Sequence, residues 1–125
     1  MTDVEGAGHG FDRGFVTYEE AAKQQMLRLP ADLTGRNDAV TSAVARAMAE
    51  GALQSSAADI VLSVTGFAGP AAPGKEEGLV HFGCARRRPP DAPARGAFRP
   101  AWPLPGRIRA LGVLLEMLEQ ALDEA

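Results

Sequence analysis

The sequence of 125 residues contains a single cysteine, Cys84, a single tyrosine, Tyr18, and a single tryptophan, Trp102. One cysteine excludes an intrachain disulfide and a cysteine-based metal cluster. No apolar run is long enough to span a bilayer, and no signal-peptide pattern opens the sequence. The net charge of −3 gives no electrostatic reason to expect a nucleic-acid partner. We therefore expect a cytoplasmic protein with neither a membrane nor a nucleic acid as partner.

The length fits a single domain over residues 1–125, and a hydrophobic fraction of 46% is enough to form a core. The sequence contains no internal repeat, Walker loop, dinucleotide-binding fingerprint or zinc-ligand spacing. Strand-like and helix-like segments alternate along the chain. The expected fold class is therefore α/β, a layered sheet with helices packed against it.

A strand that turns into a helix is predicted over residues 11–27. Side chains alternate between two faces from Phe11 to Tyr18, and Thr17 and Glu20 have the S/T-x-x-E spacing that caps a helix start. Tyr18 then lies at the junction, and Lys23 lies about one turn into the helix. Spacing alone favours a half-buried ring and a solvated ammonium group; a reaction centre is the alternative.

The middle of the chain predicts a connection over residues 30–37, a helix from Ala39 to Leu53 and a strand over residues 60–64. The strand is a nearly continuous apolar run, which is typical of a strand covered on both faces. It leads directly into Thr65-Gly66. Glycine-containing loops at the carboxyl end of a buried strand bind ligands in open α/β sheets, and an ordinary loop is the alternative.

Another strand is predicted over residues 78–85, with Val80, Phe82 and Cys84 on one face and His81 on the other. A lone histidine inside a strand, with no paired carboxylate, is more typical of a structural residue than of a general base. Cys84 is predicted to be a core residue, because no neighbouring feature would activate its thiol.

Residues 86–96 are rich in arginine and proline, which favours a solvated loop over a phosphate or nucleic-acid site. A short edge strand over residues 97–99 is predicted to stop at Pro100, and Trp102 then covers the core edge or faces a partner. Residues 106–125 form the clearest helix. Its apolar residues form one stripe at steps of three and four: Ile108, Leu111, Leu115, Leu118 and Leu122.

Three segments together resemble the CinA C-terminal family, the nicotinamide-nucleotide amidohydrolases. Residues 11–23 are similar to that family's F-x-x-G-x-V-x-Y-S-N-E-A-K, with Tyr18 and Lys23 in the places of its Tyr and Lys. Residues 38–53 are similar to its G-A-V-S-x-x-V-A-x-x-M-A-x-G-A. Residues 64–70 are similar to its V-T-G-x-A-G-P. The resemblance covers nearly the whole chain and is weak over residues 86–105.

The resemblance implies hydrolysis of nicotinamide mononucleotide to nicotinate mononucleotide and ammonia, with no metal and no cofactor. Tyr18 and Lys23 would be the catalytic residues that move protons. Thr65, Gly66 and Arg109 would bind the nucleotide substrate. Arg109 matches the second arginine of the family's G-D-R-x-x-I-R, whereas Arg107 matches the first only if residues are deleted. The resemblance places Tyr18, Lys23 and Thr65 around one concave surface.

The first ten residues are similar to the family's L-T-D-V-P-G-S-S run, which follows its E-S-C-T-G-G motif. The serine of that motif is the family's proposed nucleophile. The resemblance thus implies a domain without the family's first strand and helix, inactive as this chain. A non-catalytic binding or assembly module, or a gene remnant, is the alternative. Exposed edges would favour association, so a homo-oligomer is a further expectation.

Overall fold

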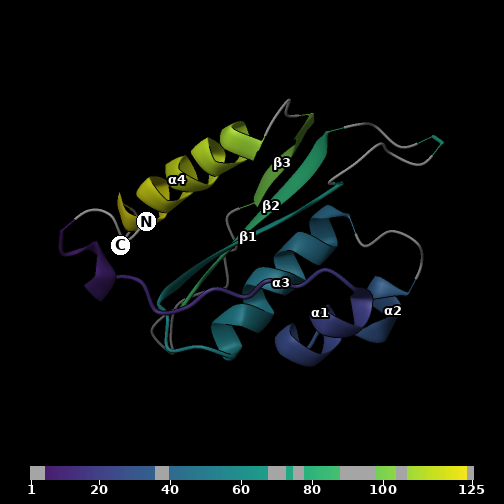
Figure 1. The fold of residues 1–125 in the computed structure, drawn as a ribbon, viewed down its shortest axis with the longest axis horizontal. Helices are drawn as coiled ribbons and strands as arrows, with labels where there is room; N and C mark the ends of the chain where they lie inside the picture. Colours follow the sequence, from purple (N-terminus) through teal and green to yellow (C-terminus); the bar gives the residue numbers. More distant parts are fainter. Residues whose placement is uncertain are drawn as a thin grey trace.

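The computed structural model describes residues 5–35, 40–67, 73–74, 78–87, 98–103 and 107–123, and only the backbone of Ala7, 98–103 and 107–108. Figure 1 shows their arrangement. The elements follow in the order η1 (Ala7–His9), α1 (Glu20–Leu27), α2 (Ala31–Thr34), α3 (Ser42–Gln54), β1 (Ile60–Gly66), β2 (Leu79–Arg86), β3 (Phe98–Pro103) and α4 (Arg107–Asp123).

The three strands form one antiparallel sheet in the order β1-β2-β3. Helix α3 packs on one face of this sheet, with α1 and α2 packed on α3, while α4 packs on the other face (Figure 1). The expected α/β class with helices on a layered sheet is therefore confirmed. The prediction that strand β1 is covered on both faces is also confirmed, because α3 and α4 both contact it.

Close contacts hold α3 on the sheet. The Ser63 hydroxyl donates to the Ala45 carbonyl oxygen at 2.5 Å. A Cβ on Gly83 would come within 2.6 Å of that same oxygen, so glycine is needed there. Helix α3 starts at Ser42 rather than at Ala39, because the Thr41 hydroxyl accepts from the Val44 amide at 3.1 Å and caps the helix.

On the opposite face, Phe82 and Cys84 of β2 pack against Met117 and Ala121 of α4. The apolar stripe identified in the sequence of α4 is not the face that rests on the sheet. Leu111, Leu115 and Leu122 are 52%, 44% and 56% exposed. Periodicity located this stripe, but it could not show that other apolar residues beside it make the core contact.

The predicted strand over residues 11–18 does not form, and neither does the predicted capping box. Residues 11–18 cross the sheet on the side of β1, and among the described residues they join no ladder (Figure 1). The N-cap residue of α1 is Glu19, whose side chain makes no cap bond. The Thr17 hydroxyl is buried without a partner. A strand needs a neighbour to satisfy its backbone groups, and in the described sheet only β2 pairs with β1.

Strand β3 continues through Pro100 to Pro103, so the prediction that Pro100 ends it is wrong. An edge strand tolerates proline because its outward side needs no donor. The connection predicted over residues 30–37 contains the short helix α2. The predictions made for residues 68–70 and 88–97, and for the side chains of Trp102 and Arg107, lie outside what the structure describes.

Candidate functional site

Lys23 lies in the interior, only 6% exposed. It is held there because α1 packs on α3 and ends cleanly: Arg28 takes the left-handed conformation, with φ of 57°, and its amide donates to the Lys23 carbonyl oxygen. Among the described residues, the Lys23 side chain forms no ion pair and no hydrogen bond. Lysine is among the residue types least often buried to this extent, which makes this position a candidate functional one.

Tyr18 has a different environment, because its ring is 88% exposed. No hydrogen bond joins Tyr18 to Lys23 in the described part of the chain. Helix α1 packs on α2 and α3, and no Cα atom of α1 lies within 8 Å of one in β1. The helix that carries Lys23 thus packs on α3, which in turn packs on the strand that carries Thr65. Convergence of Tyr18, Lys23 and Thr65 on one concave surface stays a prediction.

Thr65 is 7% exposed and lies near the carboxyl end of β1, directly opposite His81 of β2. Gly66 follows it, and a Cβ there would meet the Val80 Cγ2 at 3.0 Å and the Leu79 carbonyl oxygen at 3.1 Å. Packing against β2 is thus enough to explain why position 66 is glycine. The strand is antiparallel to β2, so the site at its end differs from the strand ends of a parallel α/β sheet.

His81 is partly buried beside Thr65, and among the described residues its buried Nδ1 atom has no hydrogen-bond partner. Burial lowers the pKa of His81 below its ordinary value, because the charged imidazolium loses hydration. A neutral imidazole next to Thr65 fits the structural interpretation of this histidine. The sequence could not show that it lies opposite a candidate substrate-binding residue, since strand register is a tertiary property.

Arg109 is exposed in the first turn of α4. Helix α4 packs on one face of the sheet, whereas α1 packs on α3, which covers the other face, so Arg109 and Lys23 come from different layers. Helices α1 and α4, which carry these two cations, do not contact each other.

Two other hydroxyl or thiol groups are candidate nucleophiles by their chemistry. The Ser63 hydroxyl is 8% exposed and is engaged by the Ala45 carbonyl oxygen. The Cys84 thiol is 9% exposed and faces the α4 side of the sheet. Neither group is placed beside Lys23, which packs with the layer of α1 and α3.

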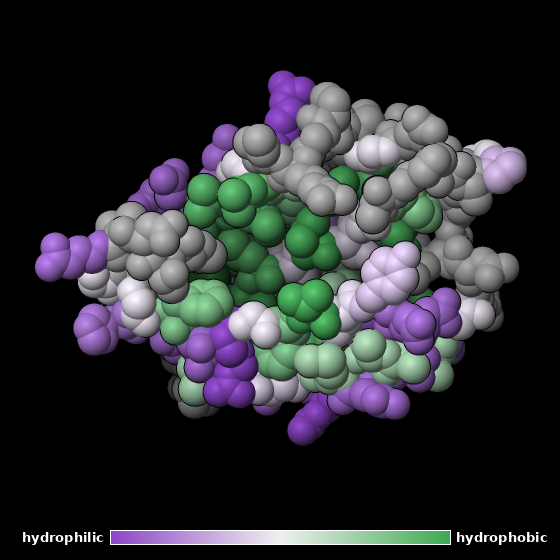
Figure 2. All heavy atoms as spheres, in the orientation of Figure 1, coloured by the Kyte–Doolittle hydropathy of each residue, from purple (hydrophilic) through white to green (hydrophobic). Residues whose placement is uncertain are grey.

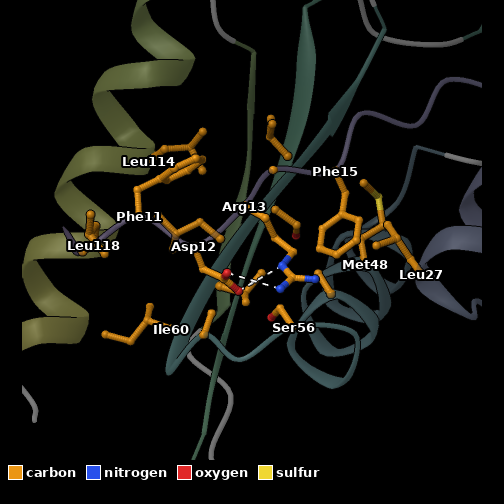
Figure 3. A pocket seen from close by; sticks show the side chains of 18 of the residues that line it. Phe11, Asp12, Arg13, Phe15, Leu27, Met48, Ser56, Ile60, Leu114 and Leu118 are labelled. Atoms are coloured by element: carbon orange, nitrogen blue, oxygen red, sulfur yellow. Dashed lines mark hydrogen bonds and ion pairs between the residues drawn. The ribbon is translucent and has the colours of Figure 1, made fainter. Parts of the chain in front are cut away.

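A groove of about 340 Å³ opens between residues 10–15, β1 and α4 (Figure 3). Its walls are largely apolar. Four of the exposed large hydrophobic side chains of the chain line it: Phe11, Val64, Leu111 and Leu115. Sequence reasoning missed this groove, although the spacing of the α4 leucines was a signal that a second face of this helix is apolar.

The polar wall of the groove is made by Asp12 and Arg13 (Figure 3). Arg13 Nε donates to Asp12 Oδ2 at 3.0 Å, and the same oxygen accepts from the Ala57 amide at 3.2 Å. The hydrogen bond from Arg13 is the main reason that the pKa of Asp12 lies below its ordinary value. This pair fastens residues 11–15 to the turn before β1 and so fixes the width of the groove.

No helix among the described residues is both long and apolar enough to cross a membrane. Within the same residues, no group of three His, Cys, Asp or Glu side chains is arranged to hold a metal ion.

Comparison with known proteins gives a consistent picture. The "Putative competence-damage inducible protein" of Symbiobacterium thermophilum is 48% identical over 89 residues, which is 70% of this chain and 21% of that relative. This chain spans about a fifth of the length of the curated relatives it matches.

Solved structures extend the match to nearly the whole chain. The competence/damage inducible protein CihA from Agrobacterium tumefaciens superposes with a TM-score of 0.82 at 32% identity, covering 95% of this chain and 73% of that one. The competence or damage-inducible protein from Enterobacter asburiae gives a TM-score of 0.79 at 25% identity, with 95% and 75% covered. The sequence profile described as "CinA C-terminal domain" matches residues 1–95. The chain therefore belongs to the CinA C-terminal domain family.

Proposed function

We propose that this domain takes part in hydrolysing the carboxamide of nicotinamide mononucleotide, and that the 125-residue chain by itself does not hydrolyse this substrate. The observation that supports the proposal most directly is the burial of Lys23, 6% exposed, at a position that matches the lysine of the family segment. Among the described residues no carboxylate pairs with Lys23, so its amino group is not engaged in a salt bridge there.

The reaction needs a nucleophile, a group that moves protons and donors for the oxyanion. A serine oxygen attacks the carboxamide carbon, the C–N bond breaks, and ammonia leaves with the proton that the serine gave up. Water then cleaves the acyl-enzyme and releases the carboxylate. In this proposal Lys23 and Tyr18 move the protons, while Thr65 and Gly66 hold the substrate near the developing oxyanion and Arg109 contacts its phosphate.

The missing component is the nucleophile. The Ser63 hydroxyl donates a hydrogen bond to the Ala45 carbonyl oxygen, and Cys84 lies on the α4 side of the sheet. The sequence contains no E-S-C-T-G-G run. About a quarter of the length of the two solved relatives has no counterpart in this chain. Loss of the nucleophile costs an enzyme of this type several orders of magnitude in rate, on the order of 10⁶.

A binding or assembly module is the second candidate function. The exposed leucines of α4 favour it, because an exposed apolar patch on a protein surface often marks a site of contact with another molecule.

The proposal includes a cytoplasmic location, with which a single cysteine and no disulfide are compatible.

Ammonia release from nicotinamide mononucleotide tests the catalytic proposal. We expect none from the 125-residue chain, and activity from a protein extended at its N-terminus by a segment bearing E-S-C-T-G-G. In the extended protein, Lys23→Met should abolish turnover while keeping the volume of the buried side chain. Thr65→Val should raise KM more than it lowers kcat.

Two results would contradict the proposal. The first is turnover by the unextended chain, which would require another nucleophile. The second is an extended, folded protein whose Lys23→Met variant remains active. As a control, Arg46→Met removes an exposed cation of α3, and we expect normal activity from it.

A further inference from the structure

The groove between residues 10–15, β1 and α4 lies beyond the edge of the sheet and not on one of its faces. Val61 of β1 packs on the α3 side and Leu62 packs on the α4 side, and both line the groove. Both covering layers also reach it, with Met48 from α3 and Leu115 from α4. A space with a helix layer on either side and a strand edge along its length has the position of a further strand of the sheet.

The two walls that face each other across the groove both lack a pairing strand. Strand β1 pairs with β2, and within the described sheet no strand pairs with its other edge. Residues 11–18 run past β1 without forming a helix or a strand (Figure 1). Among the described residues, none of their backbone groups hydrogen-bonds to another backbone group. One strand inserted between these walls would supply donors and acceptors to both.

A side chain, not a backbone ladder, holds this segment near β1. Asp12 Oδ2 accepts from the Ala57 amide at 3.2 Å, in the turn before β1 and not in the strand itself. The hydroxyls of Thr17 and Ser56 are buried and have no hydrogen-bond partner among the described residues, and Ser56 lines the groove. Because buried polar groups are normally paired, these hydroxyls also indicate a missing neighbour.

The walls of the groove decide the chemistry of the occupant. Helices lie on both sides of this position, and a strand covered on both faces is a nearly continuous apolar run. Figure 2 shows hydrophobic residues gathered in a hollow in the middle of this side of the molecule. Strand β1 lines the groove over the five residues 60–64, which sets the length of the strand that fits. The unmatched quarter of the two solved relatives is long enough to include such a strand.

We propose that this groove is a docking site for one extended, apolar peptide strand, which pairs with β1 on one side and with residues 11–18 on the other. Backbone hydrogen bonds supply the affinity in strand addition of this kind, and the apolar walls select the side chains. The inference concerns peptide binding only and does not depend on the proposed reaction, so either can fail while the other holds.

Fluorescence anisotropy of a labelled peptide tests the site on the full 125-residue chain. The probe is Lys-Lys-Val-Ile-Val-Ile-Val-Lys-Lys, which is apolar on both faces and carries lysines for solubility. We expect one peptide per chain, with a dissociation constant on the order of 10 μM. A second peptide with proline in place of the central valine stays apolar but loses a backbone donor. It should bind at least about 10-fold more weakly.

Two leucines of α4 provide a matched pair of variants. Leu115 is 44% exposed and lines the groove, whereas Leu122 is 56% exposed and does not line it. Leu115→Glu should weaken peptide binding by about 10-fold or more, because a carboxylate would be buried against the strand, and Leu122→Glu should leave binding unchanged. Circular dichroism melts check that both fold. Val64→Glu repeats the test on the opposite wall, where Val64 is 40% exposed.

Hydrogen exchange distinguishes an added strand from an apolar molecule lodged in the groove. When the peptide binds, amides of β1 and of residues 11–18 should exchange at least about 10-fold more slowly, and those of α2, which does not line the groove, should not change. Absence of binding, equal binding of the proline peptide, equal losses in the two leucine variants, or binding without slower exchange would each overturn the proposal. A dimer of the free chain in which these amides are already protected would also overturn it, because a second copy would then fill the groove.

Discussion

Gly51 of α3 lies directly against the backbone of Leu27, the last residue of α1: a Cβ on Gly51 would come within 1.8 Å of the Leu27 carbonyl oxygen. Only glycine lets the two helices approach this closely. Since Lys23 lies one turn before Leu27, this contact also fixes how deeply the Lys23 side chain is buried.

The variant Gly51→Ala should therefore lower the free energy of unfolding by about 3 kcal/mol, because backbone atoms must move to admit the methyl group. Urea unfolding followed by circular dichroism measures the change. Gly112→Ala is the matched control. It also places alanine in a helix, but into open space, so it should raise stability by about 1 kcal/mol. Equal effects at the two positions would show that α1 does not pack on α3 as described.

Arg87 should prove to be a structural clamp at the end of the sheet. Its Nη2 donates to the carbonyl oxygens of Leu53 at 3.1 Å and Ser56 at 2.9 Å, and its Nε donates to that of Ala58 at 3.2 Å. The Leu53 carbonyl lies in the last turn of α3, where helices leave acceptors unpaired, and those of Ser56 and Ala58 follow the helix. Arg87→Lys should cost about 1 kcal/mol of stability, since an ammonium group cannot reproduce the planar fork.

The control for Arg87 is Arg46→Ala. Arg46 pairs with Glu50 at 3.1 Å on the exposed face of α3, where such pairs contribute at most about 0.5 kcal/mol. A thermal melt of the two variants at equal protein concentration distinguishes them. If Arg87→Lys melts at the same temperature as the unmodified protein, the hydrogen bonds of the Arg87 guanidinium group do not stabilise this end of the sheet.

Stability should decrease as the pH falls from about 7 to about 5, through the titration of His81. Burial lowers the pKa of His81 in the folded state below the unfolded value of 6.5. Below the unfolded value the unfolded chain takes up a proton more readily than the folded chain, so protonation favours unfolding. The stabilisation is complete above the unfolded pKa and is lost as the pH falls toward the folded one.

Urea unfolding at several pH values measures this slope, and His81→Gln should flatten it. His9→Gln is the matched control, because His9 is exposed in η1 and should leave the slope unchanged. A slope that persists in His81→Gln would assign the titration to another group.

In the folded protein, Cys84 should react with thiol reagents at a rate more than about 100-fold lower than that of an exposed thiol. Its side chain is 9% exposed and packs with Phe82 and Met117 under α4. The comparison is Ala43→Cys in a Cys84→Ala background, since Ala43 is exposed on α3. Rapid labelling of Cys84 would mean that α4 leaves the sheet readily.

The sequence by itself determined the elements that local patterns encode. The hydrophobic pattern of residues 39–53 predicted helix α3, and alternation in β2 separated Phe82 and Cys84 from His81. These predictions are confirmed because burial on one face of a helix or strand repeats with the period of that element. The family, too, was readable from residues 11–23, 38–53 and 64–70.

Only the tertiary structure decided which apolar face of α4 meets the sheet and whether residues 11–18 join it. Both outcomes depend on partners distant in the sequence. The stripe through Leu115 has ideal helical spacing, yet Met117 and Ala121 fit closer to β2. Residues 11–18 alternate as a strand does, but a strand forms only where a neighbour supplies donors and acceptors. Likewise, the burial of Lys23 follows from the close approach of α1 and α3 at Gly51, which no local pattern encodes.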